Sequence, residues 1–99
     1  MAIEATEIAG VSKLIFSLCA KDLRGLSNAD GAAAFIDCEV KGANISDEVL
    51  ATKNVGTSCF SVSIAEVNSA NNVRVGLLNG CGSSTSPGNV QVSLMVYQP

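Results

Sequence analysis

The chain of 99 residues contains no histidine and no tryptophan, and only three phenylalanines and one tyrosine. Histidine is the side chain that enzymes use most often as a general base, because it titrates near neutral pH. Without it, a nucleophilic cysteine or serine would need a lysine, a carboxylate or a helix terminus to activate it. We therefore expect a protein that is not an enzyme.

Charged residues and long apolar runs are also scarce. Nine acidic and six basic residues give a net charge of −3, and the basic residues gather no more densely than the isolated pair Lys21 and Arg24. A nucleic-acid-binding surface would require a denser basic patch. The longest apolar runs, residues 14–16 and 94–97, are far shorter than the roughly 20 residues of a membrane-spanning helix. Neither nucleic acid nor a membrane is an expected partner.

The length and the first ten residues suggest how the chain is organised and where it is made. A chain of 99 residues predicts a single β-domain over residues 1–99. Its start, MAIEATEIAG, carries two glutamates, whereas a secretory leader begins with basic residues followed by an apolar stretch. We expect synthesis in the cytoplasm without a signal peptide, with a virion or particle surface as a candidate working site.

Alternating apolar residues predict strands in the second half of the chain. The clearest strand covers residues 90–97, where one face carries Val90, Val92, Leu94 and Val96. Residues 58–78 read as an antiparallel hairpin, because two alternating runs are joined by turn-forming residues 68–72. With the last strand, residues 58–98 predict a three-stranded meander.

The first half contributes two more strands and one ambiguous segment. Residues 11–20 are apolar on both faces, as in a central or covered strand, and residues 33–41 alternate. Residues 46–53 fit either a short capped helix or a loop with a short edge strand, and both alternatives stay open. The predicted fold is all-β: a small antiparallel β-sandwich or jelly-roll-like domain of six to eight strands with at most one short helix. Its predicted core contains Ile36, Val62, Ile64, Val75, Val92 and Leu94.

Four dispersed cysteines are the most unusual feature that is present. Structural zinc sites draw thiolates from closely spaced pairs, and no such pair exists here, so we expect neither a metal nor a cofactor. Cys38 lies on the same face of its predicted strand as its apolar neighbours, as expected of a buried free thiol. Cys59 and Cys81 lie on polar or glycine-rich ground and are the candidate crosslinking residues. Free thiols, disulfides within the chain and disulfides between subunits all remain open.

Two segments are more apolar than a small sandwich can bury. Residues 14–18 and 94–97 are apolar on both faces. Only Lys13 places a charge beside them that would hinder the strand edge from pairing with another chain. We therefore expect interfaces at strand edges and at these segments. The candidate interface residues are Leu14, Phe16, Leu18, Met95 and Tyr97.

In composition the chain resembles small β-sandwich proteins that coat or cement larger assemblies, such as decoration proteins of tailed-phage capsids or subunits of crosslinked extracellular filaments. The resemblance implies a non-enzymatic structural assembly protein, a decoration or cement subunit of a virion (phage capsid or tail) or a similar particle or filament. Its partners would be itself, as a homo-oligomer, or a larger protein lattice. It carries over no site residues.

The alternative is a stand-alone binding module for a carbohydrate or a peptide. Carbohydrate sites usually present aromatic faces to the sugar. Here most aromatic residues lie at the alternating strand positions that are predicted to face the core, which counts against this alternative. The four aromatic residues are Phe16, Phe35, Phe60 and Tyr97.

Overall fold

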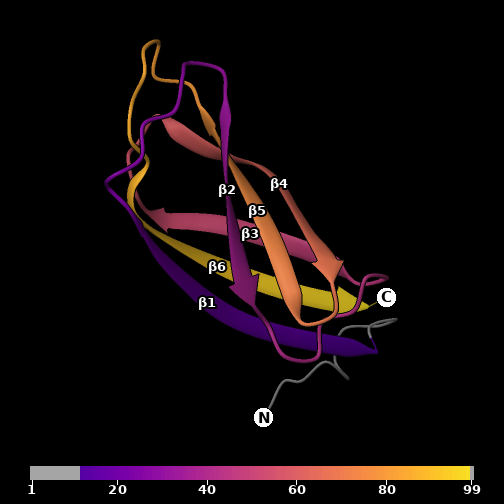
Figure 1. Cartoon of the computed structure of the whole chain (residues 1–99). Coiled ribbons are helices and arrows are strands. Elements are labelled where there is room, and N and C mark those ends of the chain that lie inside the picture. The colour runs from indigo at the N-terminus through magenta and orange to yellow at the C-terminus, as the bar shows by residue number, and fades with distance from the viewer. Residues whose placement is uncertain (1–11, 99) are drawn as a thin grey trace.

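The computed structural model describes residues 12–98, which form a small antiparallel β-sandwich (Figure 1). This part of the chain contains no helix, and hence none that could cross a membrane. One sheet has the strand order β1-β6-β3, and the other has the order β2-β5-β4. The predicted all-β fold is confirmed. The strands are β1 (Lys13–Leu23), β2 (Ala33–Glu39), β3 (Glu48–Val55), β4 (Phe60–Ser69), β5 (Asn72–Asn79) and β6 (Gly88–Gln98).

The core lies between the two central strands, β5 and β6. Alternate residues of β6 are buried, as its sequence pattern predicts, and Val73, Val75 and Leu77 of β5 are fully buried. Residues opposite each other in an antiparallel pair share one face of the sheet, so Ile15 and Cys19 of β1 also face the core. Of the predicted core, Ile36, Val75, Val92 and Leu94 are buried, and Val62 packs against them.

Ile64 is the exception, because its side chain is on the solvent face. The pairing of β4 with β5 shifts register between Val62 and Ile64, so that Ile64 lies opposite Gly76 while Ala65 takes the core position opposite Val75. A shift of one residue exchanges the two faces of a strand. The expectation that Ile64 is a core residue is therefore wrong.

The predicted hairpin is confirmed, but the meander is not. β4 pairs with β5, and the turn between them places Asn71 at a positive φ of 65°. β6 does not continue this sheet; it pairs with β1 and β3 in the other one. The Asn79 side chain holds the start of the crossing loop: its amide nitrogen donates to the carbonyls of Asn28 (2.8 Å) and Ser83 (3.0 Å), and its oxygen accepts from the amide of Cys81 (2.8 Å). Alternation predicts that a segment is a strand, but it does not choose the partner.

Two other expectations are settled by the sheet order. Of the alternatives for residues 46–53, the structure has the edge strand, β3. β1 is also an edge strand, so the first alternative for it, a central strand, is wrong. Its second apolar face is open to solvent in the single chain, and the other alternative, a strand covered by a neighbour, stays a prediction. Residues 1–11, which include the N-terminal segment and Val11 of the predicted first strand, lie outside the described residues.

All four cysteines lie in the described part of the chain, and they form two disulfides. Cys19 of β1 is bonded to Cys38 of β2, with 5.9 Å between their Cα atoms, so this bond joins the two sheets through the core. Cys59, just before β4, is bonded to Cys81, just after β5, with Cα atoms 5.0 Å apart. Cys38 is buried as expected, but it is not a free thiol. The crosslink at Cys59 and Cys81 lies within the chain and not between subunits.

Candidate interaction surface

The outer face of the sheet β1-β6-β3 carries a contiguous group of apolar side chains. In the register of this sheet, Phe16 of β1, Met95 of β6 and Leu50 of β3 form one row across the three strands. Neighbouring rows add Leu14 and Tyr97 on one side and Leu18 on the other. We call this group the outer apolar face. Its members are Leu14, Phe16, Leu18, Leu50, Met95 and Tyr97.

Three members of the outer apolar face are largely open to solvent. The exposed fractions are 71% for Phe16, 61% for Leu18 and 56% for Leu50. Scattered exposed apolar residues are common on soluble proteins, but a contiguous group of large ones usually marks an interaction site. The structure brings all five predicted interface residues together here. It adds Leu50, which the sequence did not indicate because its segment could be read as a helix or a strand.

The outer apolar face has a raised edge and two hollows beside it. Phe16 and Leu18 project from β1, and a hollow of about 260 Å³ lies between Phe16 and Leu50. Ser93 and Met95 of β6 are also part of its lining. The hollow forms because the short serine side chain lies between the larger residues of the two edge strands.

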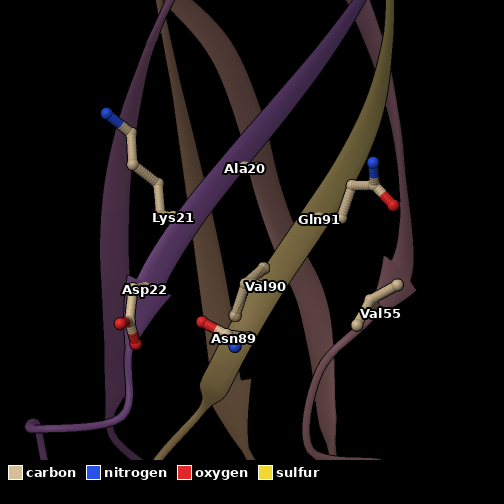
Figure 2. A pocket seen from close by; sticks show the side chains of 7 residues that line it. All are labelled: Ala20, Lys21, Asp22, Val55, Asn89, Val90 and Gln91. Atoms are coloured by element: carbon tan, nitrogen blue, oxygen red, sulfur yellow. The ribbon is translucent and has the colours of Figure 1, made fainter.

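A second hollow, of about 380 Å³, follows further along β6 (Figure 2). It opens where β1 carries the small Ala20 and where β3 ends at Val55. Figure 2 shows Asp22 at its β1 side and Gln91 on the opposite side. The full lining is Ala20, Lys21, Asp22, Val55, Asn89, Val90 and Gln91.

Asp22 at the rim of the second hollow is already engaged. The Arg24 guanidinium donates to both of its carboxylate oxygens, at 2.9 Å from Nε and 2.8 Å from Nη2. These bonds, with the backbone amide of Arg24, lower the pKa of Asp22 to about 2. Asp22 therefore stays ionised and paired at neutral pH, unlike a general acid or base, whose pKa lies near the working pH.

The edges of this sheet are better guarded than the sequence suggested. Lys13 and Lys21 of β1 and Lys53 of β3 lie opposite even-numbered residues of β6, the set that faces the core. Lys13 forms an ion pair of 2.7 Å with the buried Asp47, and Lys53 donates to the carbonyl of Thr57 at 2.9 Å. β3 also shifts register after Lys53. Inward-facing lysines and bulges hinder the addition of another strand. The expectation that Lys13 is the one guard is therefore wrong, and the open feature is the face.

The opposite sheet presents a different outer face. Phe35 of β2 is 58% exposed and lies between a charged row, which contains Asp37 and Arg74, and the partly exposed Ile64 and Leu78. The Arg74 guanidinium carbon lies 6.0 Å from the centre of the Phe35 ring, and Arg74 also pairs with Asp37 at 3.4 Å. Such a mixed surface is typical of a solvated face. It makes Phe35 a matched reference for Phe16.

The aromatic residues do not follow the parity argument made from the sequence. Phe60 is the one buried aromatic residue among those described. Phe16 and Tyr97 lie on the outer apolar face, and Phe35 lies on the outer face of the other sheet. The argument against a carbohydrate site is weakened accordingly.

Residues 12–98 contain no group of three or more histidine, cysteine, aspartate or glutamate side chains that could hold a metal ion. The candidate site among the described residues is the outer apolar face with its hollows. No protein-family model matches the chain, and searches of curated proteins and of solved structures find no significant similarity.

Proposed function

We propose that the chain is a non-enzymatic structural subunit that attaches through its outer apolar face. The host would be a larger protein assembly, and the role that of a decoration or cement subunit of a virion or of a similar particle or filament. The observation that carries this proposal is the outer apolar face itself. Covering apolar surface contributes about 25 cal/mol per Å² removed from water. Burial of this face against a partner therefore favours association, and the face needs no catalytic group for this role.

The two disulfides support a working site in an oxidising environment. Disulfides persist outside reducing compartments, on virion and cell surfaces among other places. Both bonds join residues of one chain, so each subunit is crosslinked internally before it joins the assembly. A small domain stabilised in this way can withstand conditions outside the cell without being covalently joined to its neighbours.

One observation favours a second candidate, a binding module for a carbohydrate or a peptide. The Phe16 ring is exposed and stands beside the hollow that Leu50 closes on the other side. An exposed aromatic face next to a hollow can stack against a sugar ring or accept an apolar peptide side chain. This candidate uses the same surface, so the two are separated by the size of the partner and not by the site.

The test is co-sedimentation with particles or filaments purified from the source of the protein. The oxidised wild-type chain should pellet with them, and Phe16→Ser should pellet markedly less. Phe35→Ser is the matched control, because it removes an exposed phenylalanine from the other sheet, and it should pellet like the wild type. A chain that pellets with no assembly, and that instead binds a glycan or peptide in a Phe16-dependent way, would replace the proposal with the binding module.

A further inference from the structure

We infer that the first partner of the outer apolar face is a second copy of this chain, packed face to face about a two-fold axis. The inference rests on the proposed function, because it uses the same face, and it names the occupant of that face in the free protein: the pair opens when the face meets the host assembly, so the two contacts compete. A two-fold interface needs one surface that is complementary to itself.

The guarded edges direct association to the face. Two copies could otherwise extend one sheet by pairing β1 with β1 or β3 with β3. Lys13 and Lys21 on the core-facing side of β1, and Lys53 with the register shift on β3, oppose this pairing. The outer apolar face has no such obstacle.

The shape of the face is suited to self-association. The raised edge formed by Phe16 and Leu18 lies on β1, and the hollows lie next to it along β6. A two-fold axis that runs along the strands between β1 and β6 would place the raised edge of each copy over the hollow between Phe16 and Leu50 of the other. The hollow between Phe16 and Leu50, of about 260 Å³, is also lined by Leu94 and Met95, so its apolar walls can receive an apolar side chain of the second copy.

The charge of the face also permits stacking. The chain carries a net charge of −3, so two copies repel one another in general. On this face, however, the charged residues of outward parity are Asp22 and Glu48, which lie toward opposite ends. Arg24 neutralises Asp22. The middle of the face is uncharged, so apolar contact there costs no desolvation of charge.

The area of the sheet limits the expected strength. β1 has 11 residues; at about 3.3 Å per residue and about 4.8 Å between strands, the whole outer side of the sheet measures roughly 36 by 14 Å, or about 500 Å² in projection, and the outer apolar face covers about half of it. Contact over the whole outer side, with side-chain relief, buries at most about 1,200–1,400 Å² in the pair, the lower end for a specific complex. We therefore expect reversible pairing with a Kd of roughly 1–100 µM.

The experiment is sedimentation velocity of the oxidised full chain over roughly 1–500 µM, which brackets the expected Kd. The wild type should pass from monomer to dimer. Phe16→Ser should raise the Kd at least about tenfold, and so should Ser93→Arg, which fills the hollow and leaves the raised edge intact. Phe35→Ser should leave the Kd unchanged. Circular dichroism of each variant confirms that the sandwich is folded.

A dimer that ignores Phe16→Ser, or that weakens equally with Phe35→Ser, overturns the inference. A wild-type chain that stays monomeric at the highest concentration also overturns it. If that monomer still pellets with its particle or filament, the proposed function stands and its partner is the lattice; if it pellets with nothing, both fail. A Phe16-dependent dimer that never pellets supports the pairing and contradicts the attachment to a larger assembly.

Discussion

Removal of the Cys59–Cys81 disulfide should destabilise the chain by about 3 kcal/mol without preventing folding. The bond closes a loop with a sequence separation of 22 residues. For a loop of this length, the lost restriction of the unfolded chain corresponds to roughly 3 kcal/mol at 25 °C. A domain of this size has a free energy of unfolding of about 5–15 kcal/mol, so the Cys59→Ser/Cys81→Ser variant should still fold.

The Cys19–Cys38 disulfide provides an internal comparison. Its sequence separation of 19 residues gives nearly the same loop contribution. Both of its cysteines lie in the core, however, so a Cys19→Ala/Cys38→Ala variant also leaves a cavity between the sheets. We expect a further loss of about 1–2 kcal/mol from this cavity. The difference between the two variants therefore reports packing and not loop closure.

The assay is urea denaturation followed by circular dichroism. With a slope of about 1.5 kcal/mol per M for a small domain, loss of the Cys59–Cys81 bond should lower the midpoint by roughly 2 M urea. Non-reducing electrophoresis of the wild type should show a single-chain band. A midpoint shift below about 0.7 M, which corresponds to roughly 1 kcal/mol, would refute the reasoning about loop closure. A disulfide-linked dimer of the wild type would refute the pairing within the chain.

Three further predictions follow from single residues. Leu94→Ala removes a buried side chain from the centre of the core and should cost about 2–4 kcal/mol in urea denaturation; an unchanged midpoint would contradict its placement. The Lys13 ammonium and the Asn44 amide lower the pKa of Asp47 below its ordinary 3.8, so the stability it gives is present above that pH and is lost as the pH falls toward the folded value. Asp47→Asn should therefore flatten the dependence of the unfolding free energy on pH below about 4, and a profile as steep as the wild type's would contradict this. Gly76→Ala should cost about 1–3 kcal/mol in thermal unfolding, because its new Cβ would lie 2.8 Å from Ile64 Cγ2; a stabilised variant would show that the contact relaxes freely.

The sequence predicts the strands better than it predicts their partners. The alternation over residues 90–97 identifies β6 and its buried face, because every second position is aliphatic. Which strand β6 joins depends on the whole core, and a local pattern contains no such information. The predicted meander fails for this reason. The prediction for Ile64 fails for a related reason. A register shift in β4 exchanges the two faces of the strand, and the alternation of apolar residues does not reveal it.

The candidate surface could be predicted in part. The apolar residues 14–18 and 94–97 were recognisable as excess to the core, because a strand with two apolar faces needs a second partner. That β1 and β6 are adjacent, so that these residues merge into one face, appears only in the structure. Leu50 and the inward-facing Lys53 cannot be identified from the sequence, because residues 46–53 have no clear period. The disulfide pairing cannot be identified either, because four cysteines allow three connectivities.

The most direct test of the account is carbene footprinting of Phe16 and Phe35, read by mass spectrometry, in the dilute chain and in its native assembly. Both rings are exposed in the isolated subunit, on opposite outer faces, so both should be labelled there. In the assembly, the label on Phe16 should fall by at least about fivefold, as expected for a side chain buried at the centre of an interface, while Phe35 should keep its label. Equal labelling of Phe16 in both states would show that the outer apolar face stays in water, and it would contradict the central claim.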